Sequence, residues 1–368
     1  MSAGKKTILV SVTNDLVSDH RVHKTATVLQ EEGWDVCLIG RLLPESAPVR
    51  RTYRTWRMRL PFRKHFGFYA TYNIRLFLHL LFTRFDALWA NDTDTLPANW
   101  LAARLKGKPL VFDAHELFPE VPELTQRPRI KWFWETIERW IFPKLKYSCT
   151  VCRSIADYYH QRYGIDMTVV RNIPATPPPA GITPAYHPQH RPLLLYQGAV
   201  NIGRGLEECI DLVATDPRPE LLIVGTGDIA GEIQERITAK HLEDRIKMTG
   251  RIALDQLSAY TASADIGLVL LRPQGLNYYY SLPNRIFDFI QAGIPVIASD
   301  FPEIRRIVDT YGTGRLVPDL EPATLQRALD DLQQHPVPVE NFERARSELN
   351  WEKESMGIRR LSDAIQRQ

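Results

Sequence analysis

A glycine-rich turn in the second half of the chain combines backbone amides with a cation in a way that suits an anion. Residues 196–205 read YQGAVNIGRG and follow a short apolar run. Gly198 and Gly203 permit a tight turn before a helix, where backbone N–H groups and the Arg204 guanidinium can face one phosphate. A cation there would stabilise charge that builds up on a departing diphosphate. Arg204 is therefore a catalytic candidate.

The segment 281–300, SLPNRIFDFIQAGIPVIASD, predicts a loop, a short helix and a buried strand. A helix over 284–291, closed by a glycine, would point its first N–H groups and positive dipole end at a ligand. Ser281, Asn284 and Arg285 stand at its start, and Asp288 lies one turn inside. An Asp in this position is also favourable as a partner of the dipole alone. We count Arg285 as catalytic and the other three as ligand-binding candidates.

In the first half, a histidine follows an apolar run. Residues 110–113 predict a strand, so His115 would emerge at its carboxyl end, where ligands bind in open α/β sheets. Glu116 and Glu120 come soon after. Alone, such a histidine is more often a hydrogen-bonded structural residue. With the two acids beside it, His115 becomes an active-site candidate.

Two further polar clusters follow predicted strands. Asp92 and Asp94 come after the run at 87–90 and either bind an acceptor or cap a helix at Asp94, the interpretation that we favour. In the loop after the first strand, Asp19 is placed to cap a helix, and Arg21 or Lys24 to reach a phosphate across a cleft. The histidines are dispersed, and we expect no metal site.

A dinucleotide-like motif offers a competing interpretation. The run GTGDIA at 225–230 matches the fingerprint GxGxxA, with acids at 243 and 244 downstream. An NAD-dependent dehydrogenase is therefore an alternative. Against it, the motif lies in the second strand–helix unit of its domain, and the next strand leads to Arg251 rather than to an acid. We count Gly225, Gly227 and Arg251 among the nucleotide-binding candidates.

Short apolar runs alternate with helical segments along the chain, as in parallel sheets covered by helices. The proline-rich stretch 173–192 separates two such series. The predicted fold class is α/β, with two Rossmann-like doubly wound domains that face each other across a cleft. The expected strands are 7–12, 35–39, 87–90, 110–113, 148–151, 193–197, 221–224, 246–249, 266–270 and 294–297. The expected helices are 19–32, 95–106, 129–145, 154–163, 205–214, 229–240, 254–262, 284–291 and 342–368, the last with a break near 350–352.

Together these residues resemble the family 4 glycosyltransferases of the GT-B fold, over nearly the whole chain. In that family the helix at 284–291 usually reads PNKLFEYMAAGxPVI and carries a carboxylate that holds the ribose of a nucleotide-sugar. The resemblance implies this role for Asp288, and contact with the donor sugar for His115. It also implies that a last helix, from Trp351, returns to the first domain. The expected domains are thus 1–172 with 351–368, a linker at 173–192, and 193–350.

Some positions depart from the family pattern. Ala199 stands where the family has the first cation of the glycine-rich turn, and Arg285, in the place of a lysine, is expected to compensate. The family's paired acids, spaced E-x7-E, would put the earlier acid at Tyr280. The donor sugar is then held differently, by Asn277, Ser281 or backbone groups.

The resemblance implies a retaining glycosyltransferase of the hexosyltransferase type. It would move a sugar from a UDP- or GDP-linked donor to a glycan or lipid-linked glycan, as in bacterial surface polysaccharide synthesis, without metal or cofactor. The departing phosphate would assist the incoming hydroxyl. The alternatives are a nucleotide-sugar epimerase of the same fold, the NAD-dependent dehydrogenase, and a non-catalytic membrane-surface binding protein.

Composition narrows these classes. The 368 residues carry a net charge of +3, too small to suggest a general nucleic-acid-binding role. No apolar run approaches the roughly 20 residues that span a bilayer, and the N-terminus predicts a strand rather than a signal peptide. Four scattered cysteines fit a reducing cytoplasm, and Cys149 and Cys152 are expected to pack in the core.

The segment 50–69 is rich in arginine and aromatic residues, and no acid occurs between Glu45 and Asp86. It would suit an anionic membrane surface or a lipid-linked acceptor, each basic side chain contributing about 1 kcal/mol near the headgroups. An exposed loop and RNA binding are the alternatives. We expect a cytoplasmic protein, peripheral on the inner face of the membrane. The candidates are Arg50, Arg51, Arg54, Trp56, Arg57, Arg59, Arg63 and Lys64.

Overall fold

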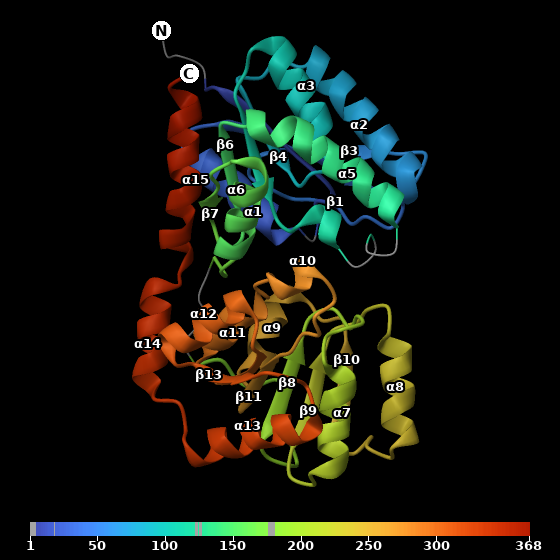
Figure 1. Ribbon diagram of the computed structural model, residues 1–368, viewed down its shortest axis with the longest axis vertical. Helices are drawn as coiled ribbons and strands as arrows, with labels where there is room; N and C mark the ends of the chain where they lie inside the picture. Colours follow the sequence, from blue (N-terminus) through green and yellow to red (C-terminus); the bar gives the residue numbers. More distant parts are fainter. Residues whose placement is uncertain (1–4, 18, 122–123, 125–126, 176–180) are drawn as a thin grey trace. The chain divides into compact units, whose positions relative to one another are not determined.

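The structure, a computed structural model, describes residues 5–17, 19–121, 124, 127–175 and 181–368. The chain forms two α/β units, Met1–Asn172 with Glu352–Gln368, and Ile173–Trp351 (Figure 1). Each unit has its own parallel sheet, as the doubly wound pattern predicts. Of the expected linker, 176–180 lies outside the described residues.

The first unit is built on a sheet of seven strands in the order β3-β2-β1-β4-β5-β6-β7. Every pairing in it is parallel. The central strands β4 and β5 are buried at every residue, as continuous apolar runs in a covered parallel sheet should be. The strands are β1 Thr7–Asp15, β2 Asp35–Leu42, β3 Arg54–Arg59, β4 Ala87–Asn91, β5 Leu110–Ala114, β6 Tyr147–Thr150 and β7 Thr168–Val169.

The helices of the first unit include the C-terminal one. Helix α15 lies beside α1 (Figure 1), where Trp34 Nε1 donates to Ser362 Oγ at 2.8 Å and Arg359 pairs with Glu31 at 2.6 Å. The chain therefore ends in the unit in which it began. The helices are α1 His20–Glu31, α2 His65–Phe82, α3 Leu96–Lys106, α5 Pro128–Ile141, α6 Arg153–Tyr163 and α15 Trp351–Gln366, with 3₁₀ turns η1 Phe118–Glu120 and η2 Phe142–Lys144.

The second unit has six parallel strands in the order β10-β9-β8-β11-β12-β13. Strands β8 and β9 are wholly buried, and helices pack apolar residues against the sheet. The strands are β8 Leu193–Gln197, β9 Glu220–Val224, β10 Ile246–Gly250, β11 Ile266–Val269, β12 Val296–Ser299 and β13 Gly314–Val317. The helices are α7 Leu206–Thr215, α8 Ala230–Ala239, α9 Leu254–Thr261, α10 Leu276–Tyr279, α11 Arg285–Ala292, α12 Pro302–Tyr311, α13 Pro322–Gln334 and α14 Val339–Glu348.

In each sheet the strand order changes direction at the first strand of the unit, β1 or β8. Strand β1 lies between β2 and β4, and β8 lies between β9 and β11. Connections leave such a point in opposite directions, so their loops part beyond the carboxyl ends of the strands, where ligands bind in this fold class. In the first unit His115 follows β5 at that edge, and in the second unit Arg204 follows β8.

The sequence does not predict several elements. Arg54–Arg59 form the edge strand β3, parallel to β2, and α2 follows it. Because β3 has only one neighbouring strand and is mostly half-buried, its sequence stays polar. An exposed loop was thus the wrong interpretation of these residues. Also missed are β7, β13, α10, α12 and α13.

Residues 181–192, expected to belong to a linker, pack on the second unit. The backbone N–H groups of Gln189 and His190 donate to Glu220 Oε2 at 2.9 and 3.1 Å. Tyr186 N donates to Ser263 Oγ at 3.0 Å. Ile173 is fully buried in the core of the same unit. The prolines here stiffen a strap along the second unit rather than a spacer.

Candidate functional site

Arg285 is the first residue of α11 and lies at the carboxyl ends of β8 and β11, where the strand order of the second sheet changes direction. Its side chain is 8% exposed, and its Nη1 and Nη2 donate to Gln197 O and Leu270 O at 3.5 and 3.3 Å. These two carbonyls stand at the carboxyl ends of β8 and β11. The guanidinium lies 4.7 Å from the centroid of the Tyr196 ring, and its Nε has no hydrogen-bond partner.

No carboxylate among the described residues pairs with Arg285, which is unusual for a buried cation. Burial lowers the pKa of Arg285, the Tyr196 hydroxyl raises it, and Arg204 lowers it again. An uncompensated charge inside a protein costs several kcal/mol. The arrangement is explained if the counter-ion is an anionic ligand.

Arg204 supplies the second cation of this region. It stands in the turn between β8 and α7, where Gly203 has a φ of 79°. This positive φ favours glycine whatever the space around it, and the terminal amide of the Gln274 side chain lies close to Gly203. The Arg204 guanidinium lies 4.8 Å from the centroid of the Tyr278 ring, and its buried Nε has no partner. Within the residues that the structure describes, two arginines without a carboxylate partner thus lie close enough for Arg204 to lower the pKa of Arg285.

Asp288 lies in the first turn of α11, beside the same edge. Its Oδ2 accepts a hydrogen bond from Gln197 Nε2 at 2.9 Å, and Gln197 Oε1 accepts one from Thr261 Oγ1 at 2.8 Å. The amide of Gln197 is therefore fixed in orientation, and it holds the carboxylate in place. Gly293 ends the helix at a φ of 76°, as its sequence position predicts.

The turn at 225–230 is packed against the turn after β8. A Cβ at Gly225 would lie 1.9 Å from Gly198 O, and one at Gly227 would lie 2.4 Å from Val200 O. The N–H of Ile229 already donates to Val200 O at 3.2 Å, and that of Asp228 to the Asn201 side chain. These glycines are explained by loop packing, and part of the amide set that a dinucleotide would need is occupied. This geometry disfavours the NAD interpretation.

The remaining residues predicted in the second unit are more scattered. Ser281 Oγ donates to Tyr278 O at 2.8 Å, and Asn277 is buried. Asn284 is the exposed N-cap residue of α11 and makes no side-chain capping bond. Arg251 is exposed after β10, two strands from β8. The structure brings Gly198, Arg204, Arg285 and Asp288 together but leaves Arg251 at the side.

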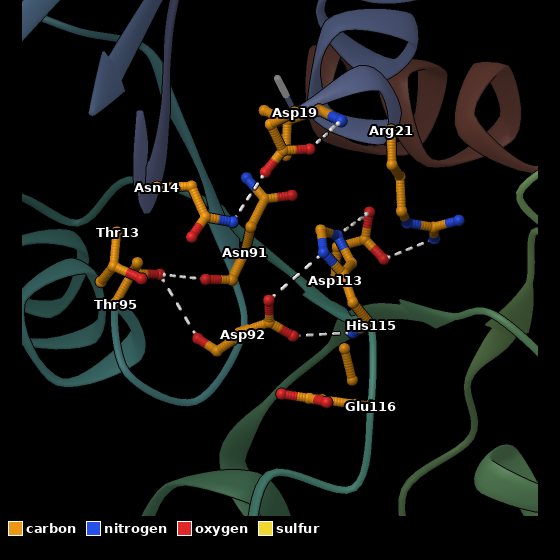
Figure 2. A network of polar contacts seen from close by, with 12 residues as sticks. Thr13, Asn14, Asp19, Arg21, Asn91, Asp92, Thr95, Asp113, His115 and Glu116 are labelled. Carbon is orange, nitrogen blue, oxygen red and sulfur yellow. Dashed lines mark hydrogen bonds and ion pairs between the residues drawn. The ribbon is translucent and has the colours of Figure 1, made fainter. Parts of the chain in front are cut away.

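In the first unit, His115 is held between two carboxylates (Figure 2). Its Nδ1 lies 3.2 Å from Asp92 Oδ2, and its Nε2 lies 3.4 Å from Asp113 Oδ2. The backbone N–H of His115 donates to Asp92 Oδ1 at 2.8 Å. Asp92 adopts a φ of 60°, a left-handed conformation that Asp tolerates better than most residues. We name these three side chains the His115 clamp.

A buried ion pair supports the His115 clamp from behind. Arg21 Nη2 lies 2.7 Å from Asp113 Oδ1, and Arg21 Nη1 donates to Val170 O at 2.7 Å. Arg21 is thus committed to Asp113, which removes it as a candidate for reaching a phosphate. Burial would raise the pKa of Asp113, but Arg21 and His115 outweigh it and hold that pKa well below its usual range.

The clamp sets the charge of His115. Burial alone would lower the pKa of His115, but Asp92 and Asp113 outweigh burial and raise it to about 10. The imidazole is therefore protonated at neutral pH, and both of its nitrogens are donors. A protonated His115 acts as a cation and donor rather than as a general base.

Glu138 braces the loop that carries Asp92. Its buried carboxyl accepts from Tyr163 Oη at 2.9 Å and from Thr93 Oγ1 at 3.3 Å. Burial raises the pKa of Glu138 to about 7, although these hydrogen bonds lower it. Neither Glu138 nor the Arg21–Asp113 pair was found from the sequence. Asp113, near the end of β5, was the one sequence feature close to His115 that pointed to this network.

Asp94 does not cap a helix, contrary to the sequence interpretation. The N-cap of α3 is Thr95, whose side chain makes no capping bond, and Asp94 is 5% exposed. Its Oδ2 accepts from Thr13 Oγ1 at 2.6 Å. Burial first, and then the charge of Asp92, raise the pKa of Asp94 to about 8. By contrast, Asp19 caps α1 as predicted, accepting from Val22 N at 3.1 Å.

Replacement of Asp94 by Asn should stabilise the protein increasingly as pH rises from 4 to 8. Unfolded Asp releases its proton near pH 4, whereas folded Asp94 holds it to about pH 8, so wild-type stability falls across this window. The difference should grow by about 1.4 kcal/mol per pH unit at its steepest. Urea unfolding at pH 5, 6, 7 and 8 measures it. Parallel curves for the two proteins would mean that folded Asp94 is already ionised.

The arginines of 50–69 divide into paired and unpaired members. Arg54 pairs with Asp35 at 2.6 Å, and Arg57 pairs with Asp15 at 3.3 Å. Trp56 stacks on His79 with ring centroids 3.9 Å apart. Arg51 donates to backbone oxygens, whereas Arg50, Arg59, Arg63 and Lys64 are exposed without a carboxylate partner among the described residues.

The structure also bears on the cysteines, on groups of metal-ligating side chains and on membrane-spanning helices. Cys149 and Cys152 are buried and form no disulfide. Within the described ranges, no group of three or more His, Cys, Asp or Glu is placed to hold a metal ion. None of the helices in the part of the chain that the structure describes is long and apolar enough to cross a bilayer.

Comparison with known proteins places both units in glycosyltransferase families. The family model "Glycosyltransferase Family 4" matches residues 20–174, and "Glycosyl transferases group 1" matches residues 193–335. The chain is 25% identical over 186 residues to the amylovoran biosynthesis glycosyltransferase AmsK of Erwinia amylovora, a match that covers 48% of this chain and 46% of that protein. It is 30% identical over 173 residues to a phosphatidyl-myo-inositol mannosyltransferase of Mycobacterium leprae, covering 44% and 40%. The matches thus span less than half of each relative.

Solved structures share the fold over nearly the full length. Sucrose-phosphate synthase from Thermosynechococcus elongatus has a TM-score of 0.80 at 20% identity, covering 98% of this chain and 99% of that one. HepE of Anabaena, in complex with UDP-glucose, has a TM-score of 0.71 at 14% identity, covering 98% and 100%. With both units matched by family models and the fold shared end to end, the chain belongs to the family 4 glycosyltransferases of the GT-B fold.

Proposed function

We propose that the protein is a retaining glycosyltransferase of the hexosyltransferase type, which uses a UDP- or GDP-linked sugar and a glycan or lipid-linked glycan acceptor. The observation that carries the donor assignment is Arg285, a buried cation that no carboxylate of the described residues pairs with. It lies near Arg204, where the strand order of the second sheet changes direction at β8. A diphosphate would supply the missing negative charge.

The residues divide the work as follows. Arg204 and Arg285 would stabilise the charge that builds on the diphosphate as the glycosidic bond breaks. Asp288, fixed by Gln197, would accept hydrogen bonds from the ribose hydroxyls. His115, whose two ring nitrogens face Asp92 and Asp113, would act on the sugar through the positive charge of its imidazolium. The departing phosphate, not His115, would then take the proton of the incoming acceptor hydroxyl, which attacks on the face that the phosphate leaves.

The family relatives support the setting of this proposal. AmsK is named for amylovoran biosynthesis, the mannosyltransferase for a phospholipid acceptor, and HepE was solved with UDP-glucose. We propose a role in bacterial surface polysaccharide or glycolipid synthesis, at the inner face of the cytoplasmic membrane, to which the protein is peripheral. We further propose that transfer needs no resident metal or cofactor, so a chelator should leave it unchanged.

Thermal unfolding with UDP, GDP and NAD in parallel tests the donor assignment. A ligand at one hundred times its dissociation constant adds about 2.7 kcal/mol to the folded state. We expect a rise in melting temperature with UDP or GDP, and its loss in Arg204→Ala. Arg218→Ala is a matched control, because Arg218 is paired with Asp216 and Asp330 away from the site.

The other outcomes separate the competing functions. A shift with NAD alone would contradict the proposal and favour a dehydrogenase. Conversion of the donor sugar without any acceptor would favour an epimerase of the same fold. A protein that neither transfers nor hydrolyses any donor would be a binding protein.

A further inference from the structure

A cavity in the first unit lies apart from the His115 clamp. It has a volume of about 550 Å³ and opens beyond the carboxyl ends of β2 and β3. Its lining includes three arginines and six apolar residues, and we call it the Arg41 pocket. Its principal lining residues are Arg41, Arg59, Arg63, Leu60, Phe62 and Phe68.

The three arginines of the Arg41 pocket have no counter-ion among the described residues. No Asp or Glu lines the cavity. Arg41 lies with its guanidinium 5.0 Å from the centroid of the buried Phe68 ring, and its Nε is buried without a hydrogen-bond partner. Like charges brought together without acids repel each other, unless an anion is bound among them.

Other arginines of the same region do pair with carboxylates. On β3, Arg54 pairs with Asp35 at 2.6 Å and Arg57 pairs with Asp15 at 3.3 Å. Arg59, on the same strand, has no carboxylate partner in the described part of the chain, and its backbone oxygen accepts a hydrogen bond from Arg75. Arg59 and the other two arginines of the pocket thus differ from Arg54 and Arg57, whose charges are matched by acids.

Apolar surface continues from the pocket onto neighbouring helices. Phe62 is 54% exposed and Phe66 is 71% exposed, and Phe66 meets Phe133 of α5 edge to face, with centroids 6.2 Å apart. Rings this exposed beside a cationic cavity suit a ligand with an anionic head and an apolar chain. Inorganic phosphate alone would leave the apolar half of the site unused.

The pocket shares the functional edge of its sheet. Strands β2 and β5 are three places apart in the order β2-β1-β4-β5, so their carboxyl ends are about 15 Å apart at roughly 5 Å per strand. His115 follows β5, and the pocket opens after β2 and β3. An extended acceptor held by its anionic end in the pocket could bring its other end near His115.

We propose that the Arg41 pocket binds a phosphate or diphosphate carried on an apolar chain, as the anchoring end of the acceptor. The role as acceptor site rests on the proposed function, whereas the binding itself does not. Arg41 and Arg59 hold the phosphate oxygens, and Leu60, Phe62 and Phe68 receive the start of the chain.

Binding of dodecyl phosphate below its critical micelle concentration tests the site, by calorimetric titration of the full chain. We expect dodecyl phosphate to bind, and inorganic phosphate and dodecyltrimethylammonium to bind at least tenfold more weakly. Arg41→Gln and Arg59→Gln should each weaken dodecyl phosphate by about tenfold. Arg153→Gln is the control, since Arg153 pairs with Asp157 on α6 of the same unit and does not line the pocket, and it should bind as wild type does.

Two results would overturn the proposal: inorganic phosphate that binds as tightly as dodecyl phosphate, or unchanged affinity in both Arg41→Gln and Arg59→Gln. Binding to phosphatidylcholine vesicles with and without phosphatidic acid then shows whether the pocket recognises a phosphate headgroup in a membrane. Melting curves with UDP and GDP on the same variants keep the two proposals apart. If dodecyl phosphate binds but neither UDP nor GDP raises the melting temperature, the proposed transferase function is contradicted and the Arg41 pocket stands. If a nucleotide raises the melting temperature but dodecyl phosphate does not bind, only the pocket proposal is contradicted.

Discussion

Arg285→Met is expected to cut sugar transfer by about 10²- to 10³-fold and leave the free energy of unfolding unchanged or higher. A preorganised cationic or hydrogen-bonding group aimed at developing charge contributes about 2.7–4 kcal/mol to a transition state. Stability should respond in the opposite sense. Replacing a buried, uncompensated cation with an apolar side chain of similar length removes a desolvation penalty. The lost hydrogen bonds, at 3.3 and 3.5 Å, are long ones.

Arg272→Gln serves as the control for this experiment. Arg272 lies just after β11, close in sequence to the carbonyl that Arg285 contacts, but it pairs with Glu208 at 2.5 Å and its side chain is 44% exposed. We expect transfer and nucleotide binding to stay within a few-fold of wild type. A melting temperature that drops by many degrees in Arg285→Met would instead identify Arg285 as a structural residue. Steady-state kinetics and urea unfolding, run on the same preparations, decide between the two.

The parts of the second unit that the sequence predicts well depend on local chemistry. Helix α11 begins and ends within one residue of the prediction because Gly293 must adopt a positive φ and the apolar positions repeat with helical spacing. The turn at Gly203 is predicted for the same kind of reason. What the sequence did not show is that no carboxylate among the described residues pairs with Arg285, because that depends on which groups meet at the ends of β8 and β11.

The first unit shows more clearly which contacts the sequence does not predict. His115 was predicted from its place after an apolar run, and β5 does end there. Its clamp was not, since Asp92 is 23 residues away and Arg21 is 92 residues from Asp113. Periodicity says nothing of such pairs. The edge strand β3 was missed for a related reason, because its arginines are matched by acids on other strands, Asp35 and Asp15, rather than by a local pattern.

The His115 clamp should make the protein less stable as pH rises from 7 to 10, relative to His115→Gln. The pKa of folded His115, about 10, lies above the unfolded value of about 6.5 because Asp92 and Asp113 outweigh burial. The clamp's contribution is therefore fully present below pH 6.5 and is lost as pH rises through 10. The difference between the two proteins should shrink by about 1.4 kcal/mol per pH unit at its steepest, measured by urea unfolding at pH 7, 8, 9 and 10.

Two variants sharpen this test. His335→Gln is the control, because it removes an exposed His whose pair with Asp331, at 2.8 Å, is screened by solvent. Asp92→Asn keeps the shape of the clamp but removes one of the two charges, so the loss of stability should begin at lower pH. A transfer rate that rises through pH 6.5 in the wild type, as a neutral imidazole base requires, would contradict the imidazolium assignment. A rate that stays level from pH 6 to 8 and falls only as His115 loses its proton would mean that the clamp maintains a cation for the sugar rather than a base for the acceptor.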